Sequence, residues 1–142
     1  MDSKLKKCLD EKRLVRIPVQ PDLVQKEMDA ASFDLNTAEE SFSEGNHKWA
    51  TVQAYYSMFH TAKALVLCRG YREKSHACLS IALKSLLVDE NLLGQSHFEH
   101  FRDCMELRDD ADYGLIYSKH SAETVIGWAN EFLEAARRII QK

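Results

Sequence analysis

The chain has 142 residues, with 19 Lys or Arg against 22 Asp or Glu, so its formal charge is −3. Its hydrophobic fraction of 45% and charged fraction of 29% are those of a globular domain and exclude a disordered chain. The acidic balance excludes general attraction to nucleic acid, so nucleic-acid binding would need a local basic patch. No run reaches the ~20 apolar residues of a membrane span, and the charged N-terminus does not match a signal peptide. We therefore expect a cytoplasmic protein that contacts no membrane.

Prolines, glycines and capping residues divide the sequence into helices. Pro18 and Pro21 separate a short helix over 2–15 from a helix over 22–43. Further helices are expected over 47–68, from Ser75 to about 90, from 97 to about 114–116, and from about 121 to the C-terminus. No alternating pattern of useful length predicts a strand. The sequence predicts an all-α protein with an N-terminal helix or arm (1–20) and a helical domain (21–142).

The four cysteines lie far apart in the sequence, and no C-x-x-C pair is present. They are Cys8, Cys68, Cys78 and Cys104. In a cytoplasmic protein such cysteines are typically reduced and buried as small hydrophobic residues. This pattern predicts four free thiols and no structural zinc site.

The helix expected over 47–68 is apolar around most of its circumference, which is typical of a central helix or of one that a partner also covers. The apolar positions are Trp49, Val52, Tyr55, Tyr56, Phe59, Leu65, Val66 and Leu67. A small bundle does not readily bury so much surface, so this helix also predicts a symmetric homodimer. Its polar positions, Gln53, Ser57 and His60, form one narrow line. That line fits either a satisfied helix–helix contact or the wall of a cleft.

The helix that begins near His97 carries charges within its apolar stripe. Phe98, Phe101, Met105 and Leu115 define the stripe, and Arg108 and Asp112 fall inside it, four residues apart. A buried guanidinium needs a partner, so the two side chains fit a buried ion pair. The other interpretation is a functional arginine at a cleft or dimer seam.

The same helix also carries His97, His100 and Cys104 on one face, which is tolerable spacing for metal ligands. No fourth ligand can be identified, and three ligands in succession on one helix seldom close a site. We expect neither a metal nor a cofactor.

The segment between the third and fourth helices is the best candidate for phosphate binding. It reads Arg69-Gly70-Tyr71-Arg72-Glu73-Lys74-Ser75-His76 and places three cations and one aromatic ring beside a helix N-terminus. Free backbone N–H groups and the helix dipole favour anions there. The alternative is an ordinary solvated loop capped by Ser75.

Several of these blocks together resemble the HEPN superfamily, and most closely its small stand-alone prokaryotic branch. The similar blocks are residues 54–65, Arg69-Gly70, Lys74-Ser75-His76 and 108–113, and the resemblance covers about 22–140. It implies an up-and-down bundle of four to five helices, usually a homodimer. Such proteins are often encoded beside a minimal nucleotidyltransferase, as a toxin–antitoxin-like pair.

Active members of this superfamily are metal-independent endoribonucleases with an Arg-x(4–6)-His motif on a late helix. Arg108 matches the arginine, which would hold the scissile phosphate, but Tyr113 stands at the first permitted histidine position. A tyrosine hydroxyl with a pKa near 10 is a poor general base at neutral pH. His120 lies too far along the sequence. The pair Arg69 and His76 satisfies the spacing only within a loop.

The resemblance and the residues together support a protein that binds RNA or a nucleotide, partners a nucleotidyltransferase, and is catalytically weak or inactive. The candidate phosphate-binding residues are Arg108, Asp112, Arg69, Arg72, Lys74, His76 and His60, and the candidate catalytic residues are Arg108 and Tyr113. One alternative is an active endoribonuclease that uses Arg108 with Tyr113, or with His76 or His120. Another is a purely structural dimerisation module.

Overall fold

The computed structural model describes residues 2–113 and 118–141, with the side chains of 107–113 left out. In chain order its elements are α1 (Ser3–Asp10), β1 (Leu14–Arg16), α2 (Pro21–Ser43), α3 (His47–Cys68), β2 (Tyr71–Glu73), α4 (His76–Leu83), the π-helical turn η1 (Lys84–Val88), α5 (Gln95–Tyr113) and α6 (Lys119–Ile140). The all-α prediction is confirmed. Within the described residues, no helix is long and apolar enough to cross a membrane.

Local signals set most of the helix boundaries. The side chain of Asn46 accepts a hydrogen bond at the start of α3, and Ser75 and Ser118 do the same for α4 and α6. Pro21 occupies the first turn of α2, where its missing N–H removes no helical hydrogen bond. The observed bounds of these helices therefore agree closely with those that the sequence predicts.

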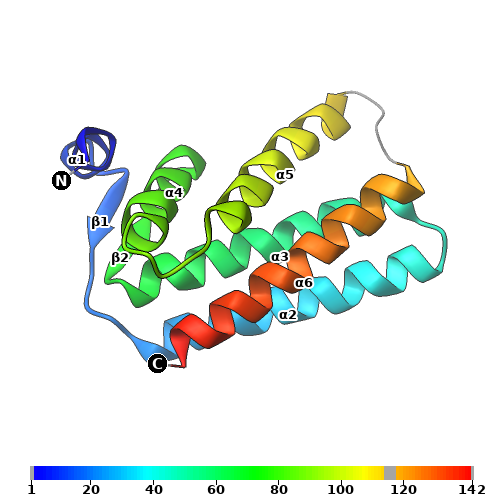
Figure 1. Cartoon of the computed structure of the whole chain (residues 1–142), viewed down its shortest axis with the longest axis horizontal. Coiled ribbons are helices and arrows are strands. Elements are labelled where there is room, and N and C mark those ends of the chain that lie inside the picture. The colour runs from blue at the N-terminus through cyan, green and yellow to red at the C-terminus, as the bar shows by residue number, and fades with distance from the viewer. Residues whose placement is uncertain (1, 114–117, 142) are drawn as a thin grey trace.

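Helix α3 lies at the centre of the molecule and packs along its length against α2 and α6 (Figure 1). Helices α4 and α5 and strand β2 cover other parts of it. Twelve α3 residues are buried, which agrees with the prediction of a central helix. Two of its aromatic side chains, Trp49 and Tyr56, nevertheless remain 52% and 38% exposed.

The polar line on α3 faces α2 and is satisfied there. Ser57 is fully buried, and its Oγ donates a 2.7 Å hydrogen bond to the Ala31 carbonyl. Gln53 contacts the Ser41 hydroxyl at 2.8 Å, and His60 contacts a carboxylate of α2. The line is therefore a helix–helix contact, the first of the two interpretations above.

The N-terminal segment differs from its prediction. Helix α1 ends at Asp10 rather than near 15, and Leu14–Arg16 pairs antiparallel with Tyr71–Glu73. The register is Leu14↔Glu73, Val15↔Arg72 and Arg16↔Tyr71. Each strand has three residues, which is too short to give a readable alternation. The partner strand also lies more than fifty residues away in sequence.

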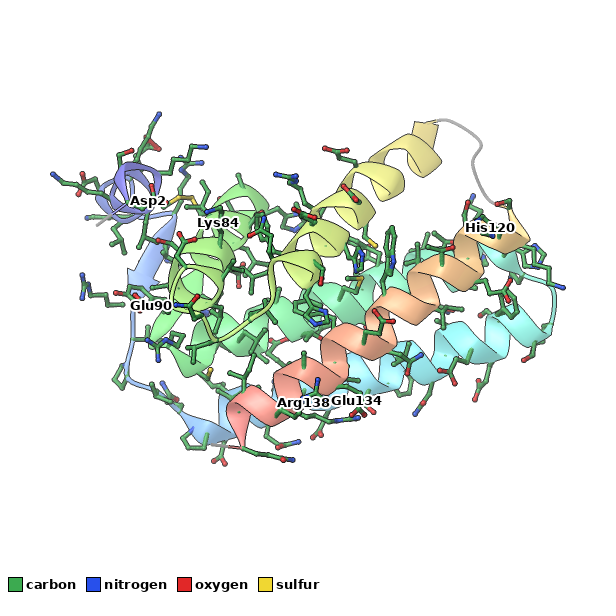
Figure 2. The ribbon with its side chains drawn as sticks, in the orientation of Figure 1. Asp2, Lys84, Glu90, His120, Glu134 and Arg138 are labelled. Carbon is green, nitrogen blue, oxygen red and sulfur yellow. A yellow bond between two sulfur atoms is a disulfide. The ribbon has the colours of Figure 1, made fainter. Side chains whose placement is uncertain are left out.

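The prediction of four free thiols is wrong for Cys8 and Cys78, which form a disulfide between α1 and α4, drawn as a yellow bond in Figure 2. Both cysteines are almost fully buried. Their sequence separation of 70 hid a pairing that only the folded position of α1 creates. Cys68 and Cys104 are free thiols.

Gly70 allows the N-terminal segment to approach the end of α3. Its φ of +85° lies in the left-handed region that favours glycine. A Cβ at this position would lie 3.3 Å from the Ile17 carbonyl oxygen, and the Ile17 amide donates to the Gly70 carbonyl at 2.9 Å. The close approach keeps the segment against the loop that holds the candidate phosphate-binding residues.

Candidate functional site

Strand β2 and the first residues of α4 present the candidate phosphate-binding side chains. Arg69, Arg72, Lys74 and His76 are all exposed. In an extended segment alternate side chains share a face, so Arg72 in β2 and Lys74, the residue directly after β2, lie on the same side. Ser75 Oγ accepts a 3.1 Å hydrogen bond from the Cys78 amide and so caps α4. The structure therefore brings these four residues to one end of the molecule.

Neither Arg72 nor Lys74 forms an ion pair within the described part of the chain. The carboxylate between them, Glu73, instead lies 3.9 Å from the Lys63 ammonium. Burial raises the pKa of Glu73, and the positive charge of Lys63 opposes this rise. The exposed side chains of Arg72 and Lys74 can thus meet an anion from solvent.

His60 lies in a different environment, a cluster that we call the α2–α3 charge network. It consists of Glu27, Asp34, His60, Lys63 and Glu73. His60 Nδ1 is 2.6 Å from a Glu27 oxygen, and its Nε2 is 3.6 Å from Asp34. Two carboxylates thus flank the imidazole and disfavour a phosphate there.

The electrostatics of the network centre on Glu27. Burial alone would raise its pKa, but the hydrogen bond from His60 and the charge of Lys63 outweigh burial and lower it. The pKa of Asp34 is raised by burial, against a weaker opposing effect of His60. Glu27 therefore stays ionised and holds α2 against α3.

His76 connects the network to the exposed loop through aromatic contacts. Its ring centroid lies 4.8 Å from that of Phe59, and the Lys63 ammonium lies 5.5 Å from the same ring. His60 also meets the Phe59 ring edge at 5.9 Å. His76 and His60 thus contact the same ring, although only His76 is exposed.

Arg108, Asp112 and Tyr113 lie in the last turns of α5, and their side chains are outside the described residues. The ion pair expected between Arg108 and Asp112 therefore falls outside them too. Arg69 lines the same groove as Gly94 and His97, so it lies near the start of α5. Arg108 lies thirteen residues beyond Gln95, the first residue of α5, which is about 20 Å along the helix axis. Within one protomer, the structure therefore does not bring the cations of the 69–76 loop together with the last turns of α5 (Figure 1).

The histidines that shared a face with Cys104 serve packing. The His100 ring stacks on Trp128 with centroids 4.4 Å apart, and the His97 ring stacks on Phe132 at 6.1 Å. Burial lowers the pKa of His97, and burial raises the pKa of the Cys104 thiol to about 12. Across the described residues, no three His, Cys, Asp or Glu side chains gather as metal ligands.

The groove near Arg69 has a volume of about 1030 Å³. The start of α2, the 91–94 loop and the end of α6 enclose it, with Arg69 and Arg138 as its charged residues. Residues Val24, Leu93 and Ile139 give it an apolar floor. Sequence reasoning gave no sign of this groove because its walls come from four separate segments of the chain.

Sequence reasoning also missed the arginines of the N-terminal segment. The Arg16 guanidinium lies 5.4 Å from the centre of the Tyr71 ring, and the Arg13 carbonyl accepts a 2.8 Å hydrogen bond from the Lys74 amide. The available signal was the density of Lys and Arg in the first sixteen residues. Nothing in the sequence showed which part of the domain this segment would join.

Comparison with known proteins places the chain in a family. The model of the HEPN domain matches residues 24–139, so the chain belongs to the HEPN family. The chain is similar to two proteins of Methanocaldococcus jannaschii named "Putative toxin MJ0605" and "Putative toxin MJ0142". The first is 26% identical over 84% of this chain and 90% of its own length, and the second is 24% identical over 82% and 81%. A "UPF0332 protein" of Archaeoglobus fulgidus is 30% identical over 76% of this chain and 87% of its own.

The α2–α3 charge network gives a test of stability. Replacing Glu27 by Gln should lower the free energy of unfolding at pH 7 by about 1–2 kcal/mol, because His60 and Lys63 lose their charged partner. A carboxyl whose folded-state pKa is lowered stabilises the fold above its ordinary pKa of about 4.5, and this contribution is lost as the pH falls through the folded-state pKa. The difference between wild type and variant should therefore shrink below about pH 4.5.

Urea unfolding at pH 7, 5 and 4 measures this difference. Glu40→Gln, an exposed change on the same helix, is the matched control and should leave the free energy within about 0.5 kcal/mol. A Glu27→Gln variant as stable as wild type at pH 7 would show that the charge of Glu27 contributes nothing to the stability of the fold.

Proposed function

We propose that this protein binds single-stranded RNA through phosphate contacts, as the toxin-like member of a pair whose other member is a minimal nucleotidyltransferase. The observation that carries the proposal is a pair of exposed cations, Arg72 in β2 and Lys74 directly after it, beside His76 at the start of α4. Within the described residues, neither cation forms an ion pair. The HEPN family match and the relatives named as toxins support the toxin-like part. The family resemblance alone suggests the nucleotidyltransferase.

The distance between the two groups of candidate residues favours RNA over a mononucleotide. Arg69 lies near the start of α5, and Arg108 lies in the last turns of that helix, about 20 Å along its axis from the start. A single nucleotide does not span that distance within one protomer, whereas a polynucleotide does. In this proposal Arg108 holds a phosphate and Tyr113 stacks on a base or donates a hydrogen bond.

In this proposal, Arg72 and Lys74 make RNA binding sensitive to salt. Replacing both Arg72 and Lys74 by Gln should weaken binding of a single-stranded RNA and reduce the slope of log K against log salt by about 1.4, since each lost phosphate contact removes about 0.7. Fluorescence anisotropy of a labelled oligonucleotide between 50 and 300 mM salt measures both quantities.

The matched control for this pair removes two cations from other helices, Arg102→Gln on α5 with Arg137→Gln on α6. This control should retain the wild-type slope. No binding of RNA by the wild-type protein at 50 mM salt would refute the proposed function.

Tyr113 makes the proposed protein a poor ribonuclease. We expect the wild-type protein to cleave RNA near background in EDTA, because the residue at this position cannot exchange protons near neutral pH. Tyr113→His supplies an imidazole with the Arg-x(4)-His spacing and should raise metal-independent cleavage. The same variant with Arg108→Ala should return to background.

A second candidate function, an active endoribonuclease, is favoured by the position of His120. This residue lies near the start of α6, at the end of the molecule where α5 ends (Figure 2). Arg108 and His120 thus belong to the same end, in contrast to Arg108 and His76. Strong wild-type cleavage in EDTA, abolished by both Arg108→Ala and His120→Ala, would establish this function instead.

We also propose that the protein is a symmetric homodimer, supported by its exposed aromatic residues on α2 and α3. Phe33 is 69% exposed, and Trp49 and Tyr56 are 52% and 38% exposed. Trp49 and Tyr56 lie seven residues apart and therefore share a face of α3. Apolar surface of this kind commonly marks a protein–protein contact.

Light scattering during gel filtration tests the dimer. Wild type should show about twice the chain mass of 16.3 kDa at micromolar concentration. Phe33→Ser with Trp49→Ser should shift the mass toward one chain, whereas Leu92→Ser, another exposed apolar position, should not. A wild-type mass of one chain at every concentration would contradict the prediction.

A further inference from the structure

Positive charge is concentrated in two sequence segments that the fold places together. Residues 1–20 and 69–76 contain nine Lys or Arg against four Asp or Glu, a net charge of +5. The remainder of the chain therefore carries −8, although the whole carries only −3. We call residues 2–20 the arm. The arm lies outside the matched family domain, which begins at residue 24.

The pairing of β1 with β2 joins the arm to the candidate phosphate-binding loop. Val15 pairs with Arg72, and the Lys74 amide donates to the Arg13 carbonyl at 2.8 Å, so the pairing continues one step beyond the strands. In such a ribbon, the side chains of two paired residues lie on the same face, and so do those of residues two apart on one strand. Arg13, Arg72 and Lys74 therefore lie on one face, with one cation from the arm and two from the domain.

The lysines of the arm extend this basic surface. Lys4, Lys6, Lys7 and Lys12 are exposed, and α1 lies beside β1 at the same end of the molecule (Figure 1). Glu11 forms ion pairs with Lys7 and Arg13. Within the described residues, Lys4, Lys6 and Lys12 have no such partner, so their charges are not neutralised by the protein.

The arm is fixed to the domain rather than loose. Leu5, Cys8 and Leu14 are buried, and the Cys8–Cys78 disulfide attaches α1 to α4. The Ile17–Gly70 hydrogen bond holds the far end of the arm. Cations on a fixed surface lose less conformational entropy on binding than cations on a flexible tail. The basic surface is therefore pre-organised.

We infer that the arm is an RNA-binding element, which extends the β2 site by contacting the phosphates of a longer RNA strand. This inference rests on the proposed function, because it concerns how far the RNA site reaches. The phosphates of one RNA strand fit exposed cations on both α1 and the neighbouring ribbon that have no ion-pair partner within the described residues. A membrane surface fits less well, since Val19 is the only large apolar side chain exposed among the described arm residues.

The test removes the unpaired arm lysines and leaves β2 intact. The triple variant Lys4→Gln, Lys6→Gln and Lys12→Gln should bind a single-stranded RNA of about twenty nucleotides ten-fold or more weakly at 100 mM salt. Its salt slope should fall by about 2, because three phosphate contacts are lost. For a short oligonucleotide of about five nucleotides, the loss should be much smaller.

A matched control removes three cations outside the arm, Lys26→Gln, Arg102→Gln and Arg137→Gln, and changes the net charge equally. If the arm variant and this control bind the long RNA alike, the inference fails while RNA binding by the wild type still stands. If the wild type binds no RNA, the proposed function fails first. An arm variant that binds long RNA like wild type but no longer binds polyglutamate would assign the arm to an acidic protein instead.

Removal of the disulfide by substitution provides an independent readout. In Cys8→Ser the arm keeps every charge but loses its covalent attachment. Affinity for the long RNA should fall several-fold, while the salt slope stays at the wild-type value, since the same phosphates are contacted. Unchanged affinity in this variant, with circular dichroism confirming a folded protein, would overturn the role assigned to pre-organisation.

Discussion

Burial of α3 is the constraint on which the other helices depend. A helix that is apolar around most of its circumference must be covered on several sides, and α2 and α6 meet this demand along its length. Small residues at the contacts, such as Ala31, Ala54 and Ala129, are fully buried and allow the helices to approach closely. The elements that follow α3 in the chain, β2, α4, η1, α5 and α6, all contact it.

Ionisable side chains in this fold divide into two kinds according to their neighbours. Lys63 and His60 lie between carboxylates and contribute to the contact between α2 and α3. Arg72 and Lys74 follow Lys63 by nine and eleven residues, yet they are exposed and form no ion pair within the described part of the chain. Residue type alone therefore does not show whether a cation is used in helix packing or faces solvent; the carboxylates around it do. By this criterion, His60 contributes to the contact between α2 and α3, whereas His76 belongs to the exposed loop.

Much of the fold was predictable because its signals are local. Asn46, Ser75 and Ser118 act as caps within a few residues of the helices they begin, and Pro21 and Gly45 mark the boundaries of α2. The arm was not predictable, since β1 pairs with a strand more than fifty residues away and Cys8 pairs with Cys78. Of the candidate site, the sequence identified the loop cations but not their neighbours across the ribbon. The carboxylates that flank His60 could not be predicted, because they belong to another helix.

The Cys8–Cys78 bond turns the chain between these residues into a covalent ring that contains α2, α3 and both strands. The connection between α2 and α3, residues 44–46, is exposed on this ring. A protease that cuts there opens the ring without releasing either piece, because the disulfide still joins them. Separation of the two fragments then requires a reductant as well as loss of the α2–α3 packing. The domain thus tolerates one backbone break in its longest helical hairpin without losing a part of itself.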